Sequence, residues 1–296
     1  MKTAPIALFV YNRPEHTRRT VEALQRNEGA AESDLFVFAD AAQTPEVAAS
    51  VKKVRNYAGS IEGFRSVRTI TRERNFGLAN SIVDGVTQIC GEYGRVIVLE
   101  DDLVTSPHFL RFMNRALETY ADDDRVGSVH GYWYPVDAPM PDSFFLRIAS
   151  SWGWGTWSRA WRLFERDGAR LLSELRRRGL TGAFDLDGAT PYTRMLEEQI
   201  AGKNDSWAIR WDASLFLAGK MSLYPGASLV SNIGFDGSGR HSPVSTAYDH
   251  ELASTPVSVE RLEPVECVEA LAALVRYYRA KRRVEVLKRL LKILGL

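Results

Sequence analysis

The chain contains little cysteine and no long hydrophobic run. Its two cysteines, Cys90 and Cys267, provide no disulfide framework and no metal-binding spacing. No stretch of about 18 apolar residues could span a bilayer, and the N-terminus has no signal-peptide pattern. We therefore expect a protein of a reducing, cytoplasmic compartment, with Cys90 in the core.

Two glycine-rich phosphate-binding motifs are also missing. No G-x-G-x-x-G follows the first predicted strand, and no G-x-x-x-x-G-K-S/T occurs in the chain. Their absence argues against a dinucleotide-dependent dehydrogenase and a P-loop ATPase. The formal net charge of +1 provides no overall field that would attract nucleic acid.

The 296 residues are 45% hydrophobic and 25% charged, which is ordinary for a soluble globular protein. The charge is unevenly distributed. Residues 276–296 contain eight Lys or Arg and one acid, a net charge of +7 that leaves −6 for the rest. Val284, Leu287, Leu290, Leu291 and Leu294 form one stripe and predict a basic amphipathic C-terminal helix. Such a helix binds an anionic membrane surface, or it docks on its own domain or on a second subunit.

The first 130 residues alternate between strand and helix patterns. The last strand of this region is expected at 126–130, and the helix at 78–93 has a clear apolar face. The alternation predicts an α/β fold with a mostly parallel, doubly wound sheet. Strands are predicted at 5–11, 35–39, 66–71, 96–99 and 126–130, and helices from Pro14 and at 45–57, 78–93 and 109–120.

The pattern changes near Tyr132, where a proline-containing loop and a Trp-rich segment, 152–161, begin. Helices are expected at 191–201 and 206–218, with short strands around Pro225. The sequence thus divides into residues 1–131, an α+β region at 132–250 and a C-terminal extension at 251–296 that carries the basic helix.

A short apolar run, Val96–Leu99, ends in the consecutive acids Glu100, Asp101 and Asp102. Three adjacent carboxylates repel one another and lose solvation unless something positive neutralises them. A divalent cation such as Mn²⁺ or Mg²⁺ suits their oxygen ligands. The alternative is a strand that ends in a solvated acidic turn.

Polar residues follow two further predicted strands, Asn12-Arg13 after the first and Asp40 after the second. The carboxyl ends of parallel strands meet at one edge of the sheet, where ligands bind in open α/β folds. We expect Asp40 to accept hydrogen bonds from a base or a ribose, or else to cap the next turn.

The segments Pro5–Pro14, Phe38–Asp40, Asn75–Asn80 and Val98–Asp102 together resemble a GT-A glycosyltransferase. The sequence is similar to bacterial family-2-like enzymes, and more closely to the N-acetylglucosaminyltransferase I type, whose short metal motif is also Glu-Asp-Asp. The resemblance covers roughly residues 5 to 242. It implies that residues 1–131 bind a nucleotide sugar and that 132–250 bind the acceptor and hold the catalytic base.

The resemblance also implies residue roles. Asp102 would bind Mn²⁺ or Mg²⁺ at the donor diphosphate, while Glu100 and Asp101 would hold sugar or ribose hydroxyls. Asp40 would contact uracil. Other donor-binding positions are Tyr11, Asn12, Arg13 and Asn80.

The catalytic base of the family falls on Asp205, which is followed by Ser206-Trp207. An acceptor hydroxyl must lose its proton as it attacks the anomeric carbon, so a carboxylate must lie within hydrogen-bond reach. Asp205 could instead cap a helix. Asp212 is the second choice for the base and Asp236 the third.

Two further segments are candidates for ligand binding. Trp152 or Trp154 would form a floor on which a sugar stacks, although large aromatic residues most often fill a core. In the Gly-rich segment 234–242, Arg240 would close over the diphosphate and His241 would be an additional metal ligand, or the segment is a loop with incidental charges.

We therefore expect an inverting, metal-dependent glycosyltransferase with a UDP-linked donor. Its acceptor would be a glycan or a lipid-linked oligosaccharide in surface polysaccharide synthesis, which fits a protein at the inner face of a membrane. The alternatives are a sugar nucleotidyltransferase and a non-catalytic carbohydrate- or nucleotide-binding protein on the same fold. The sequence identifies neither the donor sugar, nor the acceptor and linkage, nor the oligomeric state.

Overall fold

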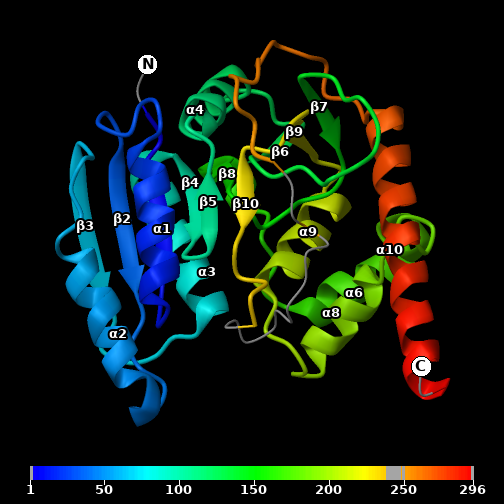
Figure 1. Cartoon of the computed structure of the whole chain (residues 1–296). Helices are drawn as coiled ribbons and strands as arrows, with labels where there is room; N and C mark the ends of the chain where they lie inside the picture. The colour runs from blue at the N-terminus through cyan, green and yellow to red at the C-terminus, as the bar shows by residue number, and fades with distance from the viewer. Residues whose placement is uncertain (1–2, 238–247, 249–250, 295–296) are drawn as a thin grey trace.

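The structure, a computed structural model, describes residues 3–237, 248 and 251–294, with side chains described as far as residue 284 in the last helix. An eight-stranded sheet in the order β3-β2-β1-β4-β8-β6-β9-β7 runs through the molecule, with helices on both faces (Figure 1). This is the α/β architecture with a large, mostly parallel doubly wound sheet in its first half that the sequence predicts.

The N-terminal elements form a parallel, doubly wound unit. The strands β3, β2, β1 and β4 pair in parallel, and β1 lies between β2 and β4. β1 is buried along its whole length, as expected for a central parallel strand covered on both faces. The elements are β1 (Ile6–Val10), α1 (Pro14–Gln25), β2 (Asp34–Ala39), α2 (Pro45–Ala58), β3 (Ser66–Thr71), α3 (Leu78–Tyr93), β4 (Arg95–Glu100), α4 (Phe109–Thr119) and β6 (Val126–His130).

The strand order reverses between β1 and β4. From β1 the chain continues outward to β2 and β3, then returns to place β4 on the other side of β1. In open α/β sheets, ligands bind in the crevice that forms at such a switch point, outside the carboxyl ends of the strands. Here this edge of the sheet, which we call the crevice, is formed by Tyr11–Arg13, which follow β1, and Asp101–Asp102, which follow β4.

The second half extends the same sheet. β8 (Trp154–Trp157) is inserted antiparallel between β4 and β6. β9 (Met221–Pro225) pairs in parallel with β6, and β7 (Ser143–Leu146) forms the antiparallel edge. A separate ribbon joins β5 (Leu103–Thr105), directly after the acidic triplet, to β10 (Val230–Asn232). The antiparallel strands β7 and β8 were not predicted, because each has only four residues and no polar alternation.

The two faces of the sheet form separate cores. Alternate residues of β1 divide between them, since Ile6 and Leu8 pack with α1, α2 and α4, whereas Ala7 and Phe9 pack with α3 and α9 (Trp207–Leu217). The second core also contains a tryptophan cluster. Its members are Trp154, Trp161, Trp207 and Trp211, with Trp161 on the short helix α5 (Ser158–Trp161).

The remaining helices pack beside this sheet. α6 (Gly168–Arg177), α7 (Thr181–Phe184) and α8 (Tyr192–Ile200) form a small core with α9. α10 (Val268–Leu294) packs its first turns against β7 and runs along one side of the molecule to the C-terminus (Figure 1). The apolar stripe predicted this helix only from Val284, 16 residues after its start at Val268. The docked half has helical spacing as well, at Ala270, Leu274, Tyr277 and Tyr278, which the prediction did not use. The division at residues 131 and 250 stays a prediction.

Candidate active site

The crevice brings together the polar residues that follow β1 and β4. The Arg13 guanidinium forms an ion pair with Asp101 and, at 2.9 Å, with Oδ2 of Asp102. The Tyr11 amide donates to the Asp101 carboxylate at 3.4 Å, and the Thr20 hydroxyl donates to the Asp101 carbonyl at 2.9 Å. Arg13 therefore supplies part of the positive charge that the acidic triplet requires.

Burial governs the electrostatics of the triplet. Loss of solvent, followed by the charges of Asp102 and Asp101, raises the pKa of Glu100 to about 8, although Arg13 opposes this shift. Burial also raises the pKa of Asp101 against the attraction of Arg13. Burial lowers the pKa of Arg13, but the charges of Asp101 and Asp102 outweigh it and raise the pKa above its usual value. The crevice is short of positive charge even with Arg13 in place.

The backbone after β10 forms another wall of the crevice. The Ile233 amide donates to the Asp102 carbonyl at 2.8 Å. A Cβ atom at Gly234 would collide with the Asp102 carboxylate and would lie 3.1 Å from Nη1 of Arg13. Residue 234 must therefore be glycine for this segment to lie against Asp102. Nearby, Asp236 pairs with Nε2 of His16 at 3.2 Å.

The donor set at Asp102 fits a divalent cation that is held jointly with a ligand. Among the residues that the structure describes, no three His, Cys, Asp or Glu side chains form a complete metal cage. Mg²⁺ at a nucleotide diphosphate takes most of its ligands from phosphate and water and needs only one or two carboxylates. Asp102 is 8% exposed and offers such a carboxylate at the crevice.

Asp40 joins the end of β2 to the loop before α3. Its carboxylate accepts hydrogen bonds from the amides of Ala41, Phe76 and Gly77, each at about 2.9 Å at its shortest. Gly77 has a φ of 72°, a conformation that favours glycine. Asp40 thus holds the 72–77 loop in place and also caps its own turn, which was the alternative reading of this residue.

The other predicted donor-binding residues lie at or near the same edge. The Tyr11 hydroxyl accepts a hydrogen bond from the Gln43 amide at 3.0 Å, and Asn12 is half-buried after β1. Asn80 is exposed in the first turn of α3, where its amide donates to the Phe76 carbonyl at 3.0 Å. Arg240 and His241 lie outside the described residues.

A cavity of about 780 Å³ occupies the second half of the molecule. Trp152 links it to the crevice, because its ring contacts Phe235 at 5.5 Å and Phe235 follows the Gly234 that lies against Asp102. The cavity is lined by loop residues 149–152 and 188–191, by α8 and α9, and by α10. Its size and its mixture of aromatic and polar side chains suit an organic ligand.

Trp152 and Trp154, either of which was predicted to stack against a sugar, lie in different surroundings. Trp154 has no exposed surface and stacks on Trp207 at 5.2 Å, so its ring offers no face to a sugar. Trp152, two residues earlier, is half-buried and lines the cavity. Trp152 lies before β8, which begins at Trp154, and Gly153 between them has a φ of 63°, so the strand's alternation does not extend to Trp152 and the two rings face different surroundings.

Asp205 lies at the start of α9, where the neighbouring Ser206, not Asp205, caps the helix by accepting from the Ile209 amide. Asp205 is exposed and lies 3.5 Å from the Arg210 guanidinium. In the first turn of α9, Trp207 stacks on Trp154 of β8, which pairs with Val98 of β4.

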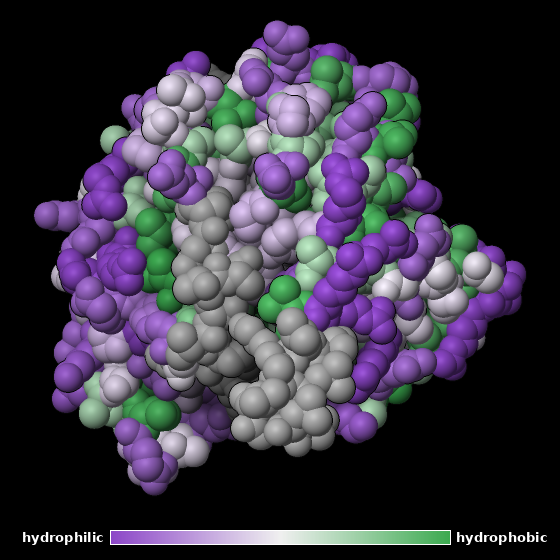
Figure 2. Space-filling view, turned by 45° about the vertical axis from the view of Figure 1, so that its right-hand side comes forward, coloured by the Kyte–Doolittle hydropathy of each residue, from purple (hydrophilic) through white to green (hydrophobic). Residues whose placement is uncertain are grey.

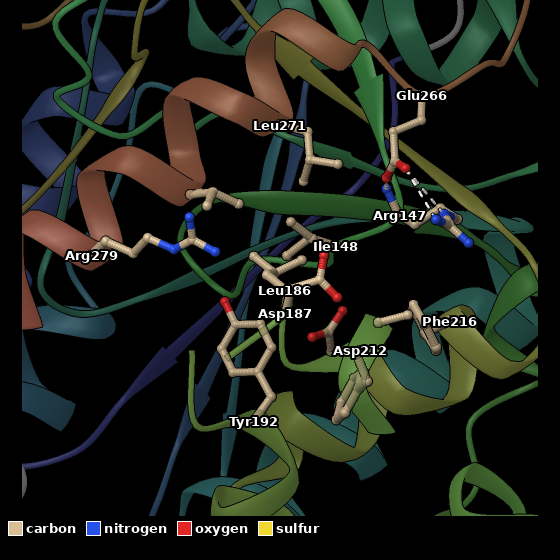
Figure 3. A pocket seen from close by; sticks show the side chains of 13 residues that line it. Arg147, Ile148, Leu186, Asp187, Tyr192, Asp212, Phe216, Glu266, Leu271 and Arg279 are labelled. Carbon is tan, nitrogen blue, oxygen red and sulfur yellow. Dashed lines mark hydrogen bonds and ion pairs between the residues drawn. The ribbon is translucent and has the colours of Figure 1, made fainter. Parts of the chain in front are cut away.

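Asp212, two turns further along α9, is buried and accepts a hydrogen bond from the Ala149 amide at 2.7 Å. Burial raises the pKa of Asp212 to about 7. Asp212 lines the larger cavity and also a smaller one of about 140 Å³. Figure 3 shows its carboxylate facing the same small space as Tyr192 and Arg279.

Several residues of these sites were not identified from the sequence. Gly234 meets Asp102 only through the fold. The cavity tyrosines, which are far apart in the chain, likewise come together only through the fold; they are Tyr134, Tyr192 and Tyr278. Only Gly234 gave a local signal, as part of the Gly-rich segment.

The exposed surface is mixed in hydropathy. On the face that Figure 2 presents, hydrophobic residues occur in small groups among hydrophilic ones. Within the described part of the chain, no helix is both long enough and apolar enough to cross a membrane.

Comparison with known proteins places this site in a family. Residues 6–182 match the family described as glycosyl transferase family 2, and the chain belongs to that family. A search of curated proteins finds no match. Among solved structures, the chain is similar to the mannosyltransferase PcManGT from Pyrobaculum calidifontis in complex with GDP-Man and Mn²⁺. The sequence identity is 11% and the TM-score 0.40, over 73% of this chain and 69% of the other.

Proposed function

We propose that this glycosyltransferase is a metal-dependent, inverting enzyme with a UDP-linked donor, which transfers a sugar to a hydroxyl of a glycan or lipid-linked acceptor. One observation carries the proposal. The carboxylates of Asp101 and Asp102 meet at the β1–β4 switch point with Arg13 as their counter-ion. The finer resemblance to N-acetylglucosaminyltransferase I, with UDP-GlcNAc as the donor, is part of this proposal.

The residues around the crevice have separate proposed roles in the mechanism. Asp102 would hold Mn²⁺ or Mg²⁺, which when bound offsets the charge of the leaving diphosphate. Arg13 lies against the same carboxylate and can turn its guanidinium to phosphate oxygens. Tyr11 and the loop held by Asp40 would bind the nucleoside, and Glu100 and Asp101 the hydroxyls of the sugar or ribose.

We propose Asp205 as the base that takes the proton of the acceptor hydroxyl. Its exposure leaves the carboxylate able to reach a ligand, and Trp207, two residues later, packs on β8, the strand next to β4. Asp212 is the competing candidate, because a carboxyl with a pKa near 7 inside a cavity is well suited to proton transfer. Asp236 ranks third because His16 already pairs with it.

The first experiment is a screen of nucleotide sugars for donor hydrolysis, with Mn²⁺ and with chelator. The proposal expects hydrolysis of a UDP-sugar that chelator abolishes. Equal hydrolysis with chelator would contradict the role of the metal. Binding of UDP and Mn²⁺ without any transfer would favour the non-catalytic alternative.

The second experiment compares Asp205→Asn with Asp212→Asn. If Asp205 is the base, Asp205→Asn retains donor binding and loses transfer, by about 100-fold or more, whereas Asp212→Asn remains active. If Asp212 is the base, its variant loses transfer instead, and the wild-type rate rises with pH through about 7.

The basic C-terminal helix completes the proposal. Contact with an anionic membrane surface would bring the enzyme to a lipid-linked acceptor. Sedimentation of the full chain with vesicles that contain an anionic lipid, and with neutral vesicles as the control, tests this step.

A further inference from the structure

The larger cavity has a distinct chemistry on the side formed by α10. Tyr278, Lys281 and Arg282 of this helix line it, and Arg194 of α8 joins them. Among the lining residues that the structure describes, the only carboxylate is Asp212, which is buried. The described lining therefore has more positive than negative charge, in contrast to the acidic crevice.

The two cations of α10 are held by neutral groups. The Lys281 ammonium donates to the Tyr248 hydroxyl and lies 3.7 Å from the centre of the Tyr248 ring. The Arg282 guanidinium donates to the Gly188 carbonyl at 3.0 Å. Among the described side chains, neither cation forms an ion pair with a carboxylate, whereas Arg194 pairs with Glu198 at 2.9 Å. Lys281 and Arg282 thus retain charge for an anionic ligand.

Tyrosine hydroxyls add uncharged donors to the same cavity. The hydroxyls of Tyr192 and Tyr278 lie 3.2 Å apart, and the rings of Tyr134 and Tyr278 are in contact at 5.4 Å. Burial raises the pKa of all three tyrosines, so they remain protonated at neutral pH. A protonated hydroxyl next to a cation is a suitable partner for the oxygens of a phosphate or carboxylate.

We propose that this cavity binds an acceptor that carries an anionic group, phosphate or carboxylate, close to the sugar that is extended, and that Lys281 and Arg282 bind that group. The identity of the ligand as an acceptor rests on the proposed function. The phosphate of a lipid-linked sugar and the carboxylate of a uronic acid share this chemistry.

The test is calorimetric titration of the full chain with three small probes, namely glucose 1-phosphate, methyl glucuronide and methyl glucoside. At least one anionic probe is expected to bind about tenfold more tightly than methyl glucoside. Preference for glucose 1-phosphate indicates a phosphate group, and preference for methyl glucuronide indicates a carboxylate. If neither anionic probe binds more tightly than methyl glucoside, the proposal is wrong.

Variants of adjacent residues distinguish binding inside the cavity from a general attraction by the positive charge of the helix. Lys281→Gln and Arg282→Gln are each expected to remove most of the preference for the anionic probe, and Lys281→Arg to retain it. Arg283→Gln removes the same charge from an exposed neighbour that does not line the cavity and should leave binding unchanged. An equal loss in Arg283→Gln would show a nonspecific field and overturn the proposal. Thermal unfolding of each variant confirms that it is folded.

A parallel titration with UDP and Mn²⁺ separates this inference from the proposed function. Probe binding that depends on Lys281, together with no binding of UDP, would leave the anion site standing and refute the proposed UDP-linked donor. Metal-dependent UDP binding with no preference for an anionic probe would refute the anion site and leave the proposed function standing.

Discussion

The crevice at the β1–β4 switch point and the cavity beside α9 are neighbouring sites of opposite character. In the crevice, Arg13 is the counter-ion of two carboxylates, and burial raises the pKa of Glu100 to about 8. In the cavity, Lys281 and Arg282 accompany one buried acid, Asp212, among the lining residues with described positions. Trp152 and Phe235 lie between the two sites.

This contrast matches the needs of two different substrates. A nucleotide diphosphate brings its own negative charge, so an acidic crevice binds it only together with a cation. A site that binds an anionic ligand directly needs cations and hydroxyl donors. The acidic crevice therefore disfavours an anionic ligand that brings no cation, whereas the cavity accepts one directly.

The largest effect is expected from Asp102→Asn. Loss of this carboxylate removes the protein ligand of the cation, and we expect transfer to fall by about 1000-fold, which corresponds to about 4 kcal/mol. Asp137→Asn is the matched control, because it removes the same charge from an exposed loop residue. Initial rates at saturating Mn²⁺ measure the change, and near-normal rates in Asp102→Asn would contradict the assignment.

Substitutions of Trp211 and Trp152 test whether a core ring stabilises the fold more than a ring of the cavity wall. Trp211 is fully buried and contacts Trp161 at 5.0 Å, so Trp211→Ala should lower the free energy of unfolding by about 4 kcal/mol. Trp152→Ala removes a half-buried ring of the cavity and should cost less than half as much while raising KM for the acceptor. Denaturant unfolding measures the stability of the two variants. Equal losses of stability would contradict the predicted difference.

Asp40→Asn tests the loop that borders the crevice. The amide group of Asn would turn a donor toward the amides of Phe76 and Gly77, so we expect about 2 kcal/mol of local destabilisation. Hydrogen exchange should become faster at these two amides and remain unchanged along α9. Unaltered protection at Phe76 and Gly77 would show that Asp40 does not hold the loop.

Asp212→Asn should make the protein more stable above pH 7. The folded pKa of Asp212, about 7, lies above its unfolded value, so ionisation in the folded state costs stability as pH rises from about 4 to 7. Asn retains an oxygen acceptor for the Ala149 amide. We expect the variant to gain about 2 kcal/mol at pH 8 and nothing at pH 4, which chemical unfolding at the two pH values can measure. A gain that does not depend on pH would contradict the shifted pKa.

The smallest effect is expected at Asp187, which lies between the two cavities. Its φ of 52° is in the left-handed region, and its side chain is exposed. Asp187→Gly should relieve this strain and raise the free energy of unfolding by about 0.5 kcal/mol. Asp185→Gly, at a neighbour without a positive φ whose carboxylate accepts from the Thr193 amide, should instead destabilise the protein.

The sequence allowed prediction of the first half of the fold in detail. The bounds of β3, α3 and β6 agree with the prediction, because these elements have regular periodicity and clear ends such as Gly94, whose φ is 78°. β8 was missed, since its position between β4 and β6 depends on pairing with residues far away in the chain.

The candidate site was predictable for a related reason. Arg13 and the acidic triplet follow strands, so local signals place them at one edge of the sheet. The cavity residues Tyr134, Tyr192 and Lys281 come from three separate segments, and no local pattern indicates that they meet. The buried position of Trp154 likewise depends on Trp207 and Trp211, which follow more than 50 residues later.

The proposed mechanism requires that the acidic crevice bind a nucleotide diphosphate through a divalent cation on Asp102. Calorimetric titration of the wild-type protein with UDP, with Mn²⁺ and with chelator, tests it most directly. We predict binding with Mn²⁺ that is at least about 100-fold weaker when the metal is removed. Equally tight binding under the two conditions, or no binding under either, would contradict the account.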